Sequence, residues 1–174
     1  MKGAIVQCLG ELVKTQFGEN KWRESLEKAG MSSTSFFMPL QNIDDANVMK
    51  LIQSVCTVTH ITPTQAADAF GDYWVNVYAP KIYTVYYKGS RSAKEFLMKM
   101  DGVHEIVTKN MPNAHPPRFT YNWTDERTLT IDYKSHRGMV DIFIGLIKGV
   151  GKYYNEKLFV TKLGSDRVKV IFPS

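Results

Sequence analysis

The sequence is poor in cysteine, with only Cys8 and Cys56 among its 174 residues. The two lie far apart and have no partner histidines at metal-ligand spacing, so the sequence indicates neither a disulfide framework nor a zinc site. Both sit in apolar stretches, which predicts small buried side chains rather than reactive thiols.

Long hydrophobic runs are also missing. No uninterrupted apolar segment approaches the roughly 20 residues that a membrane-spanning helix requires. The first residues carry one lysine and become polar again at Glu11, which is not the charged-then-apolar layout of a signal peptide. We therefore expect a cytoplasmic protein and no membrane insertion of this domain.

Familiar catalytic signatures are absent as well. The sequence has no Gly-rich phosphate loop, no His-Glu-x-x-His, no Cys-x-x-Cys and no Gly-x-Ser-x-Gly. The net charge of +5 comes from 22 basic and 17 acidic residues, and the basic residues are scattered rather than gathered in a run. We therefore predict that the protein is not an enzyme and has no nucleic-acid partner.

The first half of the chain shows helical periodicity. With 44% hydrophobic and 22% charged residues, the composition is that of an ordinary globular domain, large enough to bury a core and enclose a ligand. The predicted helices span residues 4–16, 22–29, 45–59, a stretch beginning at Thr62-Pro63, and 91–110. The fourth helix has an unusually aromatic inner face, formed by Ala66, Ala67, Phe70, Trp74, Val77 and Tyr78.

The second half of the chain changes to strand-like alternation. The predicted elements are strands 119–123 and 129–133, a helix over 138–154, and a hairpin of strands 158–163 and 167–172. We therefore expect an α+β fold in which an N-terminal helical lobe precedes a ββαββ lobe with a four-stranded antiparallel sheet. No linker-like stretch divides the chain, so we treat 1–174 as one domain, with a helical part over 1–65 and the remainder over 66–174.

His104 is the candidate metal ligand. On the predicted helix its neighbours at i−7, i−4 and i+3 are Leu97, Met100 and Val107, so the imidazole lies along an apolar stripe. This setting suits the neutral imidazole that binds iron, but it also suits an ordinary core histidine with one hydrogen bond. The sequence predicts that the three other histidines face solvent; they are His60, His115 and His136.

A second candidate site lies in the segment Tyr133–Arg137. If this segment is extended, Tyr133, Ser135 and Arg137 project to one side and place two hydroxyls and a guanidinium together. Such a group is well matched to carboxylates. The alternative is a strand end with a solvated face. Upstream, Pro116-Pro117 stiffens the chain between helix and hairpin.

Together these features resemble the H-NOX (haem nitric oxide/oxygen-binding) family, which includes the sensor domain of soluble guanylate cyclase and bacterial stand-alone sensors. The resemblance covers nearly the whole chain. It rests on Met1-Lys2-Gly3, Phe17-Gly18-Glu19 with Trp22, Phe70-Gly71, Asp101 with His104, Pro116-Pro117-Arg118, the Tyr133-x-Ser135-x-Arg137 pattern and Gly145-Leu146.

The resemblance implies a haem b buried between the lobes. His104 is then expected to be the proximal ligand of a five-coordinate ferrous iron. The other cofactor-binding residues it implies are a propionate clamp of Tyr133, Ser135 and Arg137, the packing residues Pro117 and Ile5 that distort the porphyrin, and Met100 and Leu146. The implied distal ligand pocket is lined by Leu9, Trp74, Tyr78, Ile142 and Leu146.

The distal position occupied by Ile142 bears on gas selectivity. Oxygen-binding members of the family have a tyrosine there, and a hydrogen bond to a charged group is worth about 1.5–3 kcal/mol. Ile142 offers no donor, so we predict a sensor that binds NO and CO and discriminates against O2. One alternative is an O2 sensor that uses Tyr78 or Trp74 as distal donor, and another is a haem-free module for a small apolar ligand.

The resemblance also implies a switch. Binding of NO is expected to release the bond to His104, free its helix and let the haem relax, which biases a two-state element. The expected partner is a histidine kinase, a cyclic-di-nucleotide enzyme or a chemotaxis receptor. The chain could also be the sensory segment of a longer receptor.

Overall fold

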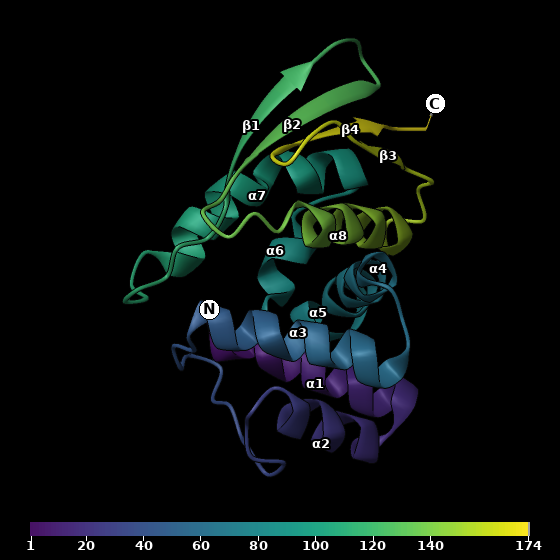
Figure 1. Ribbon diagram of the computed structural model, residues 1–174. Helices are drawn as coiled ribbons and strands as arrows, with labels where there is room; N and C mark the ends of the chain where they lie inside the picture. Colours follow the sequence, from purple (N-terminus) through teal and green to yellow (C-terminus); the bar gives the residue numbers. More distant parts are fainter. Residues whose placement is uncertain (174) are drawn as a thin grey trace. The chain divides into compact units, whose positions relative to one another are not determined.

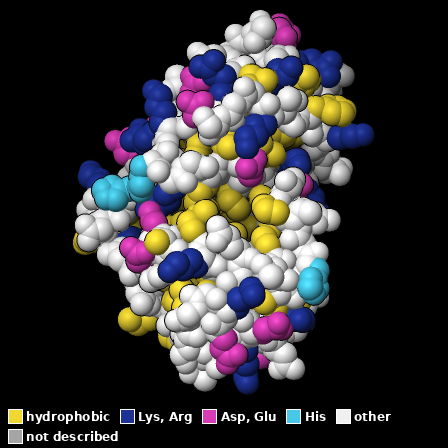
Figure 2. Space-filling model, viewed as in Figure 1, with side chains coloured by type: hydrophobic (Ala, Val, Ile, Leu, Met, Phe, Trp, Pro, Cys, Tyr) yellow, Lys and Arg dark blue, Asp and Glu magenta, His cyan; other side chains and the backbone are white. Residues whose placement is uncertain are grey.

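The computed structural model describes residues 1–173 and divides into two compact units, Met1–Ala66 and a second unit from Ala67 onwards (Figure 1). Among the described residues, no helix combines the length and the apolar character needed to cross a membrane. On the face drawn in Figure 2, Lys and Arg side chains are interspersed with Asp and Glu rather than gathered in one patch, as the scattered charges of the sequence predict.

The first unit contains three amphipathic helices, close to the predicted ranges 4–16, 22–29 and 45–59. They are α1 (Gly3–Phe17), α2 (Glu19–Lys28) and α3 (Asp45–Thr59). The Asp44 carboxylate caps α3 by accepting the N–H groups of Ala46 and Asn47 at 2.9 and 3.2 Å. The core of this unit includes the fully buried side chains of Val6, Cys8, Val13, Leu26, Val48 and Leu51.

The burial predicted for the two cysteines is confirmed in full only for Cys8, since Cys56 is half-buried. Burial raises the pKa of the Cys56 thiol. Neither of them forms a disulfide bond in the described part of the chain.

The helix predicted from Pro63 onwards is interrupted. It consists of α4 (Pro63–Tyr73), a π-helix η1 (Trp74–Tyr78) and the short helices α5 (Ala79–Ile82) and α6 (Thr84–Lys88). A π turn changes the angle at which the following residues leave the helix axis. For that reason the prediction that Val77 faces inward is wrong: its side chain is 38% exposed.

The remaining elements form the predicted ββαββ arrangement. They are α7 (Ala93–Thr108), β1 (Arg118–Trp123), β2 (Thr128–Lys134), α8 (Val140–Tyr153), β3 (Phe159–Lys162) and β4 (Arg167–Ile171). The strands make one antiparallel sheet in the order β1-β2-β4-β3. Figure 1 shows α7 and α8 against the same side of this sheet. The buried side chains of the sheet include Leu129, Ile131, Val168 and Val170.

Helices α4 and α8 cross with their backbones in contact. A Cβ atom on Gly145 would stand 2.1 Å from the carbonyl oxygen of Ala67, and one on Gly71 would stand 2.0 Å from the carbonyl carbon of Gly145. Two ion pairs flank this crossing: Asp68–Lys148 at 2.8 Å and Asp72–Lys152 at 2.6 Å. The motifs Phe70-Gly71 and Gly145-Leu146 therefore have a steric explanation, because only glycine fits at these positions.

Candidate functional site

His104 lies on α7, and its ring is oriented by a backbone carbonyl. The Nδ1 atom is 3.2 Å from the carbonyl oxygen of Pro117, which can only accept a hydrogen bond. Nδ1 therefore carries the proton, and the lone pair belongs to Nε2. An Nδ1–H donated to a backbone carbonyl is the usual arrangement of a metal-binding histidine, because it fixes both tautomer and ring orientation.

Burial lowers the pKa of His104, since a charged imidazolium is poorly solvated among apolar neighbours. The hydrogen bond to Pro117 and the charge of Asp101 partly oppose this effect, and the charge of Arg118 adds to it. The neutral ring is therefore favoured, and it lies with its centroid 5.4 Å from that of Phe119. Neutral imidazole is the form that coordinates iron.

Asp101 anchors the segment that carries the Pro117 carbonyl. Its carboxylate accepts hydrogen bonds from the Arg118 guanidinium at 2.8 and 2.6 Å and from the Phe119 backbone N–H at 2.8 Å. The hydrogen bond from Arg118 is the main cause that lowers the pKa of Asp101. Since Asp101 lies one helical turn before His104, the same helix supplies both the imidazole and the anchor of its hydrogen-bond acceptor.

Two further contacts join α7 to β1. The Tyr121 hydroxyl donates to the carbonyl of Leu97 at 2.8 Å, and the Lys94 ammonium lies 4.3 Å from the ring centroid of Trp123. Burial is the main cause that raises the pKa of Tyr121, to about 12. With the Asp101–Phe119 hydrogen bond, these pairs form three successive rungs, which we call the α7–β1 contact.

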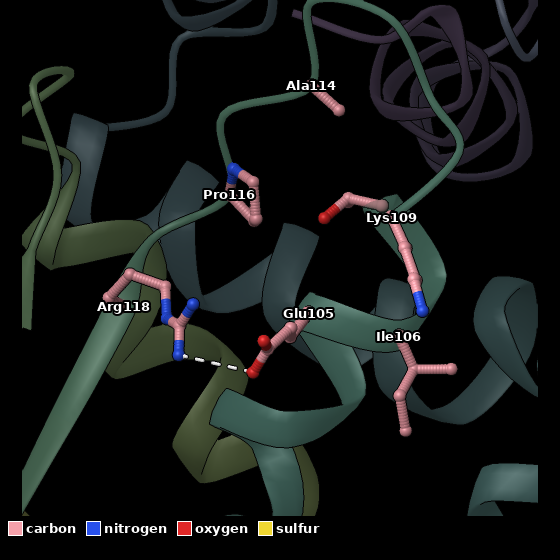
Figure 3. Close-up of a pocket in the computed structure, with 7 residues that line it drawn as sticks. Glu105, Ile106, Lys109, Ala114, Pro116 and Arg118 are labelled. Carbon is pink, nitrogen blue, oxygen red and sulfur yellow. Dashed lines mark ion pairs between the residues drawn. The ribbon is translucent and has the colours of Figure 1, made fainter.

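A pocket of about 470 Å³ lies beside the C-terminal half of α7 (Figure 3). It is lined by Glu105, Ile106, Thr108, Lys109, Ala114, Pro116 and Arg118. Arg118 and Glu105 form an ion pair in it at 3.6 Å. None of the predicted site residues lines this pocket.

The Tyr133–Arg137 segment is not extended throughout, and that part of the sequence argument is wrong. Strand β2 ends at Lys134, and residues 135–138 form a turn in which the Ser135 hydroxyl accepts the N–H of Arg137 at 3.2 Å. Backbone alternation therefore does not bring Arg137 into line with Tyr133. Instead, the Arg137 guanidinium donates to the carbonyl of His115 at 2.6 Å.

Tyr133 is buried, whereas Ser135 and Arg137 are half-buried. The Tyr133 ring stacks on Phe143, with centroids 5.2 Å apart, and packs near Phe119. The exposure predicted for the other histidines is confirmed: His60, His115 and His136 all lie at the surface.

The predicted distal residues of the second unit come from two elements that contact each other. Trp74 and Tyr78 lie in η1, where their rings stack with centroids 5.4 Å apart and planes inclined by 28°. Ile142 and Leu146 are half-buried on α8, and Met100, also half-buried, packs against the core from α7. Ile5 and Leu9 lie on α1 in the first unit, half-buried and buried, and their roles stay predictions.

Sequence reasoning missed the anchoring role of Asp101 and the side chain of Asn76, which lies in η1 and donates to the Gly149 carbonyl at 3.1 Å. A signal for the first was present: Asp101 precedes His104 by three residues, which places both on neighbouring faces of a helix. Arg118 directly follows the proline whose carbonyl meets His104. No comparable signal marked Asn76, because hydropathy patterns do not reveal a π turn.

With this geometry established, the comparisons identify the class of protein. The sequence matches the Haem-NO-binding family over residues 2–162, so the chain belongs to that family. It is an H-NOX domain, a haem-binding gas-sensor domain related to those of soluble guanylate cyclases.

Particular relatives support this assignment. The chain is 27% identical over 157 residues to soluble guanylate cyclase gcy-32 of Caenorhabditis elegans, and 26% identical to gcy-34 of the same organism over the same length. Each match covers 87% of this chain but only 23% of the relative. The chain thus spans about a quarter of the length of these curated relatives.

Solved structures agree over the full chain. A crystal structure of an oxygen-binding H-NOX domain related to soluble guanylate cyclases, in its oxygen complex, matches with a TM-score of 0.85 and 27% identity. A Cs H-NOX mutant with an unnatural amino acid at site 5 matches with a TM-score of 0.88 and 26% identity. The matches cover 100% of this chain and 96% and 97% of the neighbours. The predicted α+β fold is confirmed.

Proposed function

We propose that this chain is a haem b sensor for NO and CO in which His104 is the proximal ligand and O2 is bound poorly. The observation that carries the proposal is the half-buried imidazole, favoured in its neutral form, whose Nδ1–H donates to the Pro117 carbonyl. This leaves Nε2 as a ligand of fixed orientation. A single histidine would suit an iron whose other ligands are supplied by a porphyrin.

The carboxylates of the cofactor would be held by Tyr133, Ser135 and Arg137. Arg137 offers a planar fork of N–H donors, and its Nη1 group donates to the His115 carbonyl. The turn over residues 135–138 holds its backbone, because Ser135 accepts the Arg137 N–H. Pro117 would press on the porphyrin, and its carbonyl orients the imidazole at the same time.

The proposed gas selectivity rests on the residues of α8 and η1. Ile142 and Leu146 present only hydrocarbon, which suits NO and CO because these ligands gain little from a hydrogen-bond donor. The stacked rings of Trp74 and Tyr78 support a packing role for both. When bound, the ferrous haem supplies the iron that takes the gas.

We propose that the chain acts as a switch rather than as a catalyst. Asp101 ties α7 to Arg118 and to the Phe119 N–H, so a displacement of α7 at His104 reaches the Pro117 segment and β1 directly. The signal would then pass to a partner, for which a histidine kinase, a cyclic-di-nucleotide enzyme or a chemotaxis receptor remains our expectation.

The replacement His104→Gly tests the haem ligand. We expect the variant to lose its haem absorption band and to recover it when free imidazole is supplied, because imidazole can enter the vacated space. His60→Asn is the matched control, since His60 is exposed and asparagine tolerates its left-handed backbone, with φ of 58°. Unchanged haem content in His104→Gly would overturn the proposal.

Spectra of the parent protein separate the remaining alternatives. We expect the reduced protein to change its absorption on addition of NO or CO but not on exposure to air. A stable change in air that is abolished in Tyr78→Phe or Trp74→Phe would instead establish the O2 sensor. Failure to retain haem at all would favour a module for a small apolar ligand.

A further inference from the structure

The π turn η1 is the least regular part of the helical chain that carries Trp74 and Tyr78. Its defining hydrogen bond runs from the Ala79 N–H to the carbonyl of Trp74, five residues earlier. Such turns are rare, because they disturb the regular i→i+4 pattern, and they occur often at functional sites. A π turn therefore needs a local interaction that stabilises it against the ordinary helix.

The Asn76 side chain supplies that interaction. Its Nδ2 group lies 3.2 Å from the carbonyl oxygen of Asp72 and 2.8 Å from the Asp72 carboxylate. The Asp72 carbonyl is the group that would accept the Asn76 backbone N–H in an unbroken α-helix. The side chain thus donates to a backbone oxygen in the last turn of α4, just before η1 begins.

Asn76 also joins η1 to α8. The same Nδ2 group donates to the carbonyl of Gly149 at 3.1 Å, 73 residues further along the chain. Gly149 sits at the helix crossing, where a Cβ atom would stand 2.6 Å from the carbonyl oxygen of Gly71. Asp72 is held from the other side by Lys152 at 2.6 Å. The position of Asn76 is therefore fixed by both helices.

Asn76 lies midway in sequence between the two aromatic residues of the proposed distal pocket. Trp74 precedes it by two positions and Tyr78 follows it by two, and their rings stack at 5.4 Å. Because a π turn has more residues per turn than an α-helix, losing it would rotate Tyr78 about the helix axis relative to Trp74. The relative position of the two rings therefore follows from the π turn, and Asn76 is the residue of that turn whose side chain bonds to both α4 and α8.

We propose that Asn76 is a positioning residue for gas selectivity: it holds η1 in the π conformation and so fixes the Trp74 and Tyr78 rings. This inference rests on the proposed function in its second part, since it assumes that the two rings border the gas site. The first part, the control of ring geometry, stands on the contacts of Asn76 alone.

The test compares Asn76→Ala with Lys148→Ala. The control also removes a link between α4 and α8, the Asp68–Lys148 ion pair, but leaves η1 intact. In Asn76→Ala we expect the near-ultraviolet circular dichroism of the stacked pair, identified with Trp74→Phe, to be lost. We also expect the Ala79 amide to exchange its hydrogen about tenfold faster, because the turn opens more easily without the side-chain bonds. Lys148→Ala should change neither.

The gas measurement uses the same two variants with haem bound. We expect the CO dissociation rate to change severalfold in Asn76→Ala and to stay at the parent value in Lys148→Ala. Unchanged dichroism and Ala79 exchange in Asn76→Ala would overturn the positioning role. A changed ring signal with an unchanged CO rate would overturn the selectivity role while leaving the haem sensor intact. Absence of gas binding in the parent would refute the proposed function, and with it the selectivity role, but the ring measurements would still decide the positioning role.

Discussion

The replacement Gly145→Ala reverses the usual effect of adding a methyl group to a helical glycine. In an isolated helix alanine is favoured over glycine by about 1 kcal/mol. In this protein the new Cβ would stand 2.1 Å from the Ala67 oxygen and 2.7 Å from the Ala67 carbonyl carbon. Carbon atoms in contact prefer about 3.5–4.0 Å, so α4 and α8 would have to separate by roughly 1 Å.

The clash cannot be relieved by a side-chain rotation, because the atoms that it involves belong to the backbone of α4. Overpacking of this kind costs typically about 1–3 kcal/mol and occasionally more. Because backbone atoms are involved, we take the upper end of this range, about 3 kcal/mol, and subtracting the helix-propensity gain of about 1 kcal/mol leaves a net loss of about 2 kcal/mol. For a chain of this size that corresponds to a fall in Tm of about 4–8 °C.

Gly102→Ala is the control for this prediction. Gly102 lies in the middle of α7 and is exposed, and a Cβ atom there would meet nothing within 4 Å. We expect this variant to be more stable than the parent by about 0.5–1 kcal/mol. Urea denaturation of the three proteins, with the slope m checked for constancy, measures both changes. Equal or greater stability of Gly145→Ala would refute the close backbone crossing.

Three further predictions concern the site. Arg137→Ala should release haem about ten- to a hundredfold faster, because a charged hydrogen bond to a carboxylate is lost; a dissociation rate equal to the parent's would place the clamp elsewhere. Asp101 has a lowered pKa, chiefly through its hydrogen bond from Arg118, so its stabilising effect is present above its ordinary value of 3.8 and lost as the pH falls through the lower folded value. Thermal unfolding of Asp101→Asn should therefore occur at lower temperature than that of the parent at neutral pH and depend less on pH in the acid range; parallel pH profiles would contradict this. Ile142→Tyr should raise O2 affinity about ten- to a hundredfold if the hydroxyl reaches the bound gas, and an unchanged O2 titration would show that it does not.

The sequence predicted the elements well wherever hydropathy has one clear period. The helices before residue 60 and both hairpins follow from such patterns. The interruption at Trp74–Tyr78 could not be predicted, because it depends on a side-chain donor, Asn76, and on a carbonyl of α8 that is distant in sequence. An aromatic-rich face carries no information about such long-range hydrogen bonds.

The site was predictable to different depths. The apolar stripe of α7 indicated that His104 has apolar neighbours, but its hydrogen bond to a carbonyl 13 residues later is a tertiary contact that the sequence does not reveal. The argument for Tyr133, Ser135 and Arg137 assumed a strand that continues to Arg137. The strand in fact ends at Lys134, where the chain turns and the Ser135 hydroxyl accepts the Arg137 N–H. Where a strand ends depends locally on whether a backbone N–H donates to a nearby side-chain oxygen or to the neighbouring strand.

The α7–β1 contact has a mechanical consequence. From Asp101 to Leu97 the helix rises about 6 Å, and from Phe119 to Tyr121 the strand advances about 6.6 Å. The Asp101–Phe119 and Leu97–Tyr121 contacts are therefore nearly equally spaced along helix and strand. At the third contact the spacing differs more, and the long Lys94 side chain reaches across to the Trp123 ring. The next register that offers the same spacing lies a full helical turn away, about 5.4 Å along the axis. Because α7 cannot slide by a fraction of that distance without breaking the first two rungs together, helix and strand are expected to move as one rigid lever, with His104 near one end and the Trp123 ring at the other.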